Sequence, residues 1–238
     1  MIPVHIMEFR VENKYLVSDA DLAVIAGRLS QVMPQDAHQT GNSYEIRSVY
    51  FDDLQDRCAD ENEAGLDQRE KYRIRSYDGS SNVIHLEIKE KVRGFTKKRS
   101  CNLTLEEYTQ ILAGTIPLTL DNREPLNKLK LQMRCAGMAP KVIIAYERTA
   151  FVYPAGNVRV TFDRNISASR YCDTFFDTHV SGLVPVLPKG MHVLEVKYDD
   201  FLPDFIAKAL ELGTLQQTAF SKYYLGRLAI RGEFPVGF

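Results

Sequence analysis

Charged residues fall at every second position in several short segments of this chain, which is the spacing of a β-strand. The clearest segments are residues 69–75 (REKYRIR) and 85–91 (HLEIKEK). Because successive side chains of a strand point to opposite faces, Lys71, Arg73 and Arg75 would share one face and the residues between them the other. The spacing therefore predicts a sheet with one apolar face and one charged face.

The same alternation returns at residues 8–14, 159–163 and 195–197. In any single strand, a half-buried sheet with its charged face in solvent would give this pattern. Its recurrence favours a different arrangement, in which many strands present charge to one shared, inward-facing surface. Such a surface would bind a polyanion, because burying unpaired ions costs several kcal/mol unless a counter-charge accompanies them.

Composition limits the kinds of partner that the chain could bind. A length of 238 residues, 45% of them hydrophobic, suits a single globular domain, and no linker divides residues 1–238. The formal net charge of −1 argues against a nucleic-acid binder that relies on overall basicity. Residues 69–99 nevertheless hold ten Lys or Arg against four Asp or Glu, so positive charge is concentrated in one region.

Cysteine spacing and hydropathy bear on the compartment. Cys58, Cys101, Cys135 and Cys172 are widely spaced and form no CxxC pair, so neither a zinc site nor a disulfide framework is expected. The N-terminus lacks a signal-peptide pattern, and no run of about 18 apolar residues occurs. We therefore expect a cytoplasmic protein with reduced thiols and no direct insertion into a membrane.

The order of the expected elements is that of an α+β protein. Ser18 and Thr104 are the N-cap residues of two helices, and Glu107 completes a capping box with Thr104. Because several strands follow one another directly, an antiparallel sheet is expected. The acidic segment 54–67 is either a short helix or a loop. Strands are expected at about residues 8–14, 44–51, 69–77, 83–91, 95–101, 141–153, 157–163 and 191–198, with helices at about 18–33, 104–113, 125–137, 202–212 and 221–229.

The charged face has the residue types that phosphate recognition needs. Arginine binds phosphate oxygens through two parallel hydrogen bonds, and lysine acts as a point charge. Interleaved carboxylates suit a hard cation, since Mg²⁺ or Mn²⁺ binds through one or two carboxylates together with substrate phosphate oxygens. The candidate anion ligands are Arg73, Arg75, Lys89, Arg148 and Arg159, and the candidate metal ligands are Glu8, Glu12, Glu87 and Glu195.

Other features of the sequence leave their roles open. Tyr50, Tyr146 and Tyr223 either donate to phosphate, orient arginines or pack in the core. Glu8, Glu12 and Glu87 are either metal ligands or counter-charges that orient an arginine. The chain contains no P-loop and no protein-kinase motif set, so any phosphate site must be built from side chains.

An ordered series of short motifs, taken together, resembles the VTC domain, the polyphosphate polymerase module of the vacuolar transporter chaperone complex. That family belongs to the triphosphate tunnel metalloenzymes, the CYTH-like superfamily. The motifs run in order over nearly the whole chain, which makes the series specific although each motif alone is weak. They are residues 10–16 (RVENKYL), 48–53 (SVYFDD), 71–75 (KYRIR), 86–89 (LEIK), 146–148 (YER), 159–163 (RVTFD), 194–197 (LEVK) and 221–224 (SKYY).

The resemblance implies an eight-stranded antiparallel β tunnel, or barrel, with peripheral helices and basic side chains inside. It also implies a divalent metal, Mn²⁺ or Mg²⁺, and an ATP, triphosphate, pyrophosphate or polyphosphate substrate, with no nucleic-acid partner. The catalytic phosphate ligands expected from it are Lys14, Arg73, Arg75, Lys89, Arg148, Arg159 and Lys222. The substrate-binding residues expected are Arg10, Lys71, Lys91, Lys97, Lys98, Lys197 and Ser221. Glu195 is the expected metal ligand, with Glu87 and Glu12 beside it.

Three functions are compatible with these residues. The leading hypothesis is a metal-dependent polyphosphate polymerase, an ATP:polyphosphate phosphotransferase. A triphosphatase of the same tunnel type, acting on inorganic triphosphate or a nucleoside triphosphate, would use the same cations and pass the phosphoryl group to water. A sensor that binds polyphosphate or nucleotide without turnover would keep the basic residues and gain nothing from Glu195. A membrane partner that takes up the polymer stays an open question.

Overall fold

The computed structural model describes residues 10–37, 39, 41–92, 95–213 and 215–233, so Glu8 lies outside the described residues. The strands are β1 (Val11–Ser18), β2 (Tyr44–Asp52), β3 (Arg69–Tyr77), β4 (Ile84–Val92), β5 (Phe95–Leu103), β6 (Ala139–Tyr153), β7 (Val158–Ser169), β8 (Val184–Pro185) and β9 (Met191–Tyr198). The helices are α1 (Asp19–Leu29), α2 (Arg57–Glu63), α3 (Leu105–Leu112), α4 (Glu124–Cys135), α5 (Asp204–Leu210) and α6 (Lys222–Arg231), with 3₁₀ turns η1 (Ala155–Asn157) and η2 (Cys172–Thr174).

Eight of the strands follow the hydrogen-bonded order β1-β9-β7-β6-β2-β3-β4-β5, and β8 pairs with β7. Every strand pair whose register is described runs antiparallel. The α+β class and the antiparallel sheet are therefore confirmed. The chain forms two compact units: unit 1 comprises residues 1–44, 147–164 and 190–220, and unit 2 comprises residues 45–146, 165–189 and 221–238.

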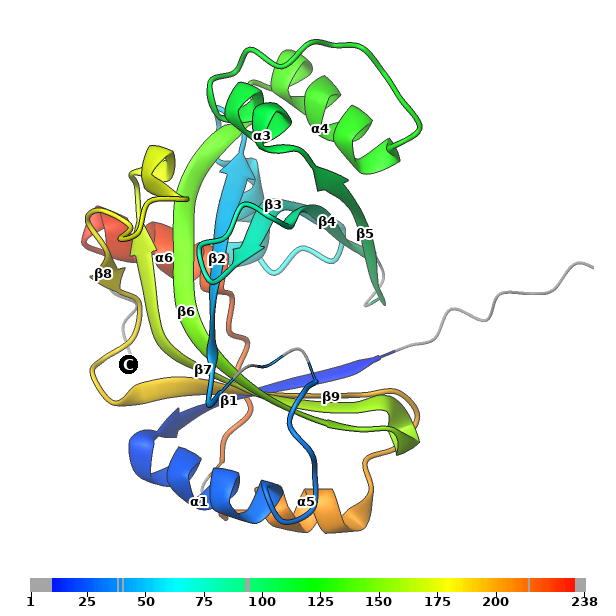
Figure 1. Ribbon diagram of the computed structural model, residues 1–238, viewed down its shortest axis with the longest axis vertical. Coiled ribbons are helices and arrows are strands. Elements are labelled where there is room, and N and C mark those ends of the chain that lie inside the picture. The colour runs from blue at the N-terminus through cyan, green and yellow to red at the C-terminus, as the bar shows by residue number, and fades with distance from the viewer. Residues whose placement is uncertain (1–9, 38, 40, 93–94, 214, 234–238) are drawn as a thin grey trace, which may run out of the picture. The chain divides into compact units, whose positions relative to one another are not determined.

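In unit 1, strands β1, β9 and β7 lie side by side, and helices α1 and α5 cover one face of them (Figure 1). That face is apolar because every second strand residue is hydrophobic. Val160, Leu194 and Val196 pack there against Ile25 of α1 and Ile206 of α5, all of them buried. The charged residues of the same strands are left on the opposite face.

In unit 2, strands β2 to β5 form a meander, and α3 and α4 lie at its β4–β5 side (Figure 1). Ile74 and Leu86 are paired across β3 and β4 and fully buried. Leu126 and Leu129 of α4 are buried as well, with 0% exposure each. Unit 2 thus repeats the plan of unit 1, with a sheet that is apolar on its helix-covered face and charged on the other.

Most local predictions are confirmed. Ser18 accepts from the Asp21 backbone and Thr104 from the Glu107 backbone, each in a capping box. Segment 54–67 holds the short helix α2. The predicted first strand is displaced, because β1 continues to Ser18, and β7 runs six residues past the predicted end at residue 163. The two-residue β8 was not predicted, since so short a bridge leaves no periodic signal.

Among the described residues, none of the helices combines the length and the apolar character that a membrane span requires.

Candidate functional site

The charged side of unit 1, here called the carboxylate face, brings basic and acidic residues of four strands together. The β1–β9 register sets Glu12 opposite Lys197 and Lys14 opposite Glu195, so the charges alternate across the pair. Lys14 Nζ lies 2.9 Å from a Glu12 carboxylate oxygen and 3.7 Å from one of Glu195. Lys197 Nζ lies 3.3 Å from Glu195 and 3.7 Å from Glu12. Two carboxylates therefore share the same two lysines.

Arg148 of β6 extends this network into the interior of unit 1. Its guanidinium donates to both carboxylate oxygens of Asp163, at 2.6 and 2.7 Å, and lies 3.6 Å from Glu195. Asp163 is fully buried, with 0% exposure, and Arg148 is 8% exposed. A buried two-pronged pair of this kind fixes the guanidinium plane and compensates both charges.

Arg159 of β7 completes the carboxylate face. Its guanidinium lies 2.5 Å from the buried carboxylate of Asp36, in the segment after α1, and donates to the Tyr44 hydroxyl at 3.4 Å. Burial raises the pKa of Tyr44 despite the nearby Arg148 and Arg159, so its hydroxyl stays protonated at neutral pH. Each predicted phosphate ligand of unit 1 thus has a carboxylate partner within the unit.

The charged side of unit 2, here called the basic face, is built by register across β3, β4 and β5. The residues of these strands that share this side include seven Lys or Arg and one carboxylate. They are Arg69, Lys71, Arg73, Arg75, Glu87, Lys89, Lys91 and Lys98. Residues paired directly across a sheet project from the same face, so this composition gives the basic face a large excess of positive charge.

Glu87 is the carboxylate at the centre of the basic face. One of its oxygens contacts Arg73, at 2.6 Å from Nε and 2.5 Å from Nη2, and the other contacts Lys98 Nζ at 2.6 Å. Burial alone would raise the pKa of Glu87, but Arg73, Arg75 and Lys98 more than offset it and hold that pKa far below its ordinary value. Glu87 is therefore ionised at all physiological pH values, and it orients Arg73.

A row of three lysines crosses the basic face next to Glu87. Lys71 lies opposite Lys89, and Lys89 opposite Lys98. Like charges directly opposite each other in a sheet are destabilising, and a bound anion would relieve that repulsion. Arg99, the residue after Lys98, belongs to the other face and contacts Glu90 and Glu124. Strand alternation places Lys97 with Arg99, so within this cluster Lys98 is the residue on the basic face.

Tyrosines and the start of α6 line the basic face near Arg73 and Arg75. Arg73 donates to the Tyr50 hydroxyl at 3.1 Å, and Arg75 lies 3.4 Å from the Tyr146 hydroxyl. The Lys222 ammonium lies 5.1 Å from the centre of the Tyr146 ring, in the geometry of a cation–π contact. Burial would raise the pKa of Tyr50, but Arg73 and Arg75 outweigh it and lower that pKa.

A family model for the VTC domain matches residues 9–230, nearly the whole chain. The chain belongs to the VTC domain family. The resemblance to this family that the sequence motifs predicted is therefore confirmed. A search of curated proteins finds no match.

One solved structure supports the fold of this VTC domain. A Bacillus halodurans protein provisionally named an adenylate cyclase is 13% identical, with a TM-score of 0.53 over 90% of this chain and 94% of that chain. A mimivirus capping-enzyme triphosphatase is 10% identical, with a TM-score of 0.37 over 83% of this chain and 85% of that chain, too low to carry an argument. The first likeness shows the fold alone.

Two of the three expected metal ligands of the VTC domain suit a hard cation. Glu12 and Glu195 offer oxygen donors close to the same two lysines. Mg²⁺ or Mn²⁺ needs only one or two carboxylates when substrate phosphates supply the other oxygens. Among the described residues, no three His, Cys, Asp or Glu side chains form a group that could hold a metal by themselves. The donor set therefore fits a cation that arrives with a phosphate substrate.

The remaining predicted substrate-binding residues of the VTC domain have varied surroundings. Lys71 donates to the side chains of Asn62 and Ser221, the latter at 2.9 Å. Arg10 contacts the Asn157 carbonyl at 2.7 Å and Asp199 at 3.6 Å. Lys91 lies opposite Arg69 and Thr96 in the register. The roles predicted for these residues, and that of Glu87 as a metal ligand, stay predictions.

Sequence reasoning assigned no role to Asp163 or Asp36, the partners of Arg148 and Arg159. Alternation along β7 places Asp163 on the same face as Arg159, so the pattern held a usable signal for it. Asp36 lies in a loop segment outside any periodic element, and nothing in the sequence pairs it with Arg159. Loop residues that supply counter-charges are therefore the part of the site that a pattern search misses.

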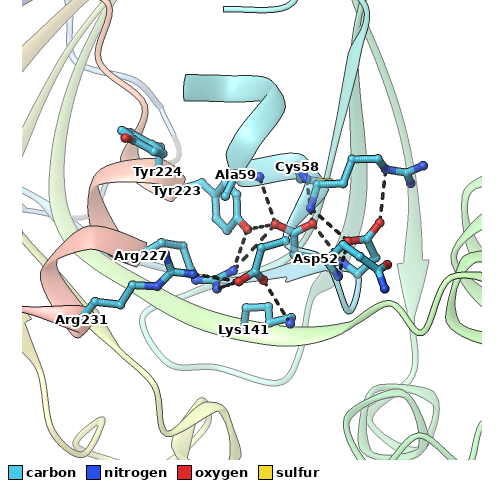
Figure 2. A network of polar contacts seen from close by, with 12 residues as sticks. Asp52, Cys58, Ala59, Lys141, Tyr223, Tyr224, Arg227 and Arg231 are labelled. Carbon is cyan, nitrogen blue, oxygen red and sulfur yellow. Dashed lines mark hydrogen bonds and ion pairs between the residues drawn. The ribbon is translucent and has the colours of Figure 1, made fainter. Parts of the chain in front are cut away.

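A second polar network in unit 2 anchors α6, the helix that carries Lys222 (Figure 2). Asp52, at the end of β2, accepts backbone N–H groups of Asp53, Cys58 and Ala59 at 2.8–3.0 Å and also the Tyr223 hydroxyl. Gly226 lets α6 approach β6 closely, because a Cβ there would come within 2.2 Å of a side-chain carbon of Ile144. The start of α6 is thus fixed both by packing and by hydrogen bonds.

Proposed function

We propose that this VTC domain is a metal-dependent polyphosphate polymerase that transfers the γ-phosphoryl group of ATP to a polyphosphate chain. The observation that carries the proposal is the basic face, on which seven cations accompany one carboxylate across β3, β4 and β5. A sheet that held only surface salt bridges would balance its charges more nearly. Membership of the VTC domain family supports a phosphate-containing substrate for this face.

The proposal gives the two faces different tasks. Arg73, Arg75, Lys89 and Lys222 of unit 2 bind phosphate oxygens and hold the polyanion. Lys14, Arg148 and Arg159 of unit 1 are the phosphate ligands beside the carboxylates that would hold the cation. Charge neutralisation and positioning provide most of the acceleration in phosphoryl transfer, so the reaction requires no covalent protein intermediate.

Glu195, with Glu12, would hold Mn²⁺ or Mg²⁺ in this proposal. When bound, the cation would neutralise the negative charge that develops on the phosphates. The lysines that contact both carboxylates, Lys14 and Lys197, would then be released to contact the substrate. Ion pairs among the protein's own groups therefore keep the carboxylate face compensated when no ligand is bound.

The reaction balances without a further reactant. A terminal oxygen of the polyphosphate chain attacks the γ-phosphorus, and a new P–O–P bond forms. The bond between the γ-phosphorus and the bridging β–γ oxygen breaks, and its electrons leave with ADP. The polymer grows by one phosphate, and the terminal oxygen that attacks needs no general base because it is already ionised at neutral pH.

The proposal is tested by incubating the protein with γ-labelled ATP and Mn²⁺ and resolving polymer, ADP and orthophosphate. Glu195→Gln is compared with the unmodified protein, and Glu147→Gln is the matched control, since Glu147 is exposed and sits beside Arg148 on the same strand. We expect a polymer ladder that Glu195→Gln reduces by about 100-fold or more and Glu147→Gln preserves.

Two outcomes would overturn the polymerase assignment. Orthophosphate without polymer would identify a triphosphatase, in which water accepts the phosphoryl group. Tight binding of ATP or polyphosphate without any turnover would identify a sensor. Tripolyphosphate affinity measured on Glu195→Gln distinguishes a lost reaction from a lost binding site, and we expect that affinity to be unchanged or stronger.

A further inference from the structure

Consecutive residues at the start of α6 each contact a tyrosine that in turn contacts an arginine of β3. Lys222 lies over the Tyr146 ring, and the hydroxyl of Tyr146 faces Arg75. The Tyr223 ring stacks on Tyr50, with ring centres 5.3 Å apart and an interplanar angle of 29°. The hydroxyl of Tyr50 accepts from Arg73 at 3.1 Å. One helical turn is therefore connected to both arginines through aromatic rings.

The far end of the Tyr223 side chain, its hydroxyl, is also fixed. Its hydroxyl donates to Asp52, which is fully buried, and accepts from Arg227 at 3.0 Å (Figure 2). Arg227 is held in turn by Asp56 at 2.7 Å, and Asp56 also contacts Arg231 at 2.8 Å and Lys141 at 3.2 Å. Tyr223 is itself only 1% exposed. Contacts with neighbouring side chains therefore hold both its ring and its hydroxyl.

The Tyr50 ring consequently has little freedom. Asp52 follows Tyr50 two residues later on the same strand, so the anchor of the Tyr223 hydroxyl and the ring that Tyr223 stacks on belong to one element. Stacked aromatic pairs are stabilised beyond the area that they bury, which is enough to bias a side-chain orientation. Arg73 is then constrained from two sides, by the Tyr50 hydroxyl and by Glu87.

We propose that Tyr223 is a positioning residue for Arg73, acting through the stacked Tyr50 ring while Asp52 and Arg227 hold its own hydroxyl. The inference rests on the proposed function in one respect, that Arg73 binds phosphate. A guanidinium that is already oriented loses less conformational freedom when an anion binds, so its orientation in the free protein raises the affinity for the anion. Tyr223 itself touches no reacting atom.

The test is a double-mutant cycle on the affinity of the full chain for inorganic tripolyphosphate, measured by calorimetry with EDTA present. Tyr223→Leu removes the stacked ring and the hydroxyl, and Tyr223→Phe removes the hydroxyl alone. We expect Tyr223→Leu to weaken binding about tenfold, equivalent to about 1.4 kcal/mol, and Tyr223→Phe to weaken it about threefold. Tyr224→Phe is the matched control. It removes the hydroxyl of the neighbouring residue, which contacts Glu63, and should leave affinity unchanged.

Combination with Arg73→Ala separates positioning from general destabilisation. If Tyr223 acts through Arg73, Tyr223→Leu causes no further loss once Arg73 is alanine, whereas it still causes its full loss in an Arg75→Ala background. An equal loss in all three backgrounds, or no loss in the unmodified one, would overturn the proposal. Thermal unfolding of each variant with and without tripolyphosphate establishes that the proteins compared are folded.

The same experiment distinguishes this inference from the proposed reaction. An unmodified protein that binds tripolyphosphate and shows the expected coupling, yet makes no polymer, would overturn the polymerase and leave the positioning role standing. Failure of the unmodified protein to bind tripolyphosphate, both with EDTA and with Mn²⁺, would overturn both. Polymer synthesis with no coupling between Tyr223 and Arg73 would overturn the positioning role alone.

Discussion

The carboxylate face of unit 1 and the basic face of unit 2 are built from the same strand pattern but are compensated in different ways. Each of the four cations of the carboxylate face, Lys14, Arg148, Arg159 and Lys197, has a carboxylate within 4 Å in its own unit. On the basic face, a single glutamate lies among seven cations of β3, β4 and β5. The alternation of charged residues in a sequence therefore does not by itself indicate the net charge of the sheet face that they form.

Because the two faces differ in charge balance, removing a similar cation from each face should have different effects. Removing a cation from a compensated pair leaves a buried carboxylate alone, so the cost falls on folding. Arg75 of the basic face contacts only hydroxyl groups among the partners described, so removing it relieves repulsion among neighbouring cations and the cost falls mainly on binding an anion. Arg148 and Arg75 should thus be separable by experiment, the first through a loss of stability and the second mainly through a loss of affinity.

The largest expected effect is that of Arg148→Ala on folding. This change leaves the fully buried Asp163 without its two hydrogen bonds, and breaking a buried pair on one side costs about 3–5 kcal/mol. The free energy of unfolding from urea denaturation measures it. Arg148→Lys keeps the charge but loses the fork, and should cost less. A loss below about 1 kcal/mol for Arg148→Ala would contradict the view that unit 1 uses this arginine for stability.

Arg75→Ala should show the opposite behaviour. Arg75 contacts the hydroxyls of Ser48 and Tyr146 at 3.4 Å each, which are weak contacts to lose. A charge-assisted hydrogen bond to phosphate is worth about 1.5–3 kcal/mol, so affinity for tripolyphosphate should fall by more than about tenfold, while the free energy of unfolding should fall by less than in Arg148→Ala. Arg99→Ala is the matched control, because Arg99 lies on the other face of the sheet. Equal loss of affinity in both variants would indicate general charge and not a site.

Glu87→Gln tests whether the basic face contains a counter-charge or a metal ligand. The pKa of Glu87 is held below its ordinary 4.5 when folded, so the carboxylate contributes stability above that pH and loses the contribution as pH falls through the folded value. At pH 7 the variant should be less stable by about 1.5–3 kcal/mol, and this difference should shrink steadily below about pH 4.5. Urea denaturation at several pH values measures it.

Affinity gives a second reading of the same variant. With EDTA present, Glu87→Gln should bind tripolyphosphate more tightly, because the carboxylate that competes for Arg73 and Lys98 has become neutral. If Glu87 were a metal ligand, the variant would instead lose the increase in affinity that Mn²⁺ provides. Glu12→Gln, a substitution on the carboxylate face, is the comparison. We expect this variant to lose the increase in affinity that Mn²⁺ provides.

The sequence predicted the strands of this site better than it predicted their charge balance. The bounds of β3 and β9 match the predicted 69–77 and 191–198 because their alternation is strict and turn residues flank them. The observed register keeps the charged residues on one face, whereas a one-residue slip would move every charge of a strand to the apolar face. Arg73, Arg75 and Glu87 therefore share a face, as predicted.

The carboxylate partner of a cation could not be predicted in the same way where the two partners are far apart in the chain. Asp36 reaches Arg159 from a loop segment, and Tyr223 reaches Asp52 across 171 positions. Such contacts follow from the packing of helices and loops on the sheet, for which a single sequence carries no periodic signal. The cluster at residues 97–99 is a different case, because strand alternation alone divides it between the two faces of the sheet.

The smallest predicted effect comes from that cluster and uses strand alternation as its own control. Lys98 contacts Glu87 on the basic face, whereas Lys97 pairs in register with Glu90, whose side chain belongs with Arg99 on the other face. The Lys98 side chain is 53% exposed, so solvent screens its charge and the change should be small. We expect Lys98→Ala to weaken tripolyphosphate binding about two- to threefold and Lys97→Ala to leave it unchanged, with both effects fading as salt is raised. The two substitutions remove the same charge from adjacent positions, so an equal loss would show that the anion senses only the overall field of β5. An unequal loss would show that it binds one face of that strand.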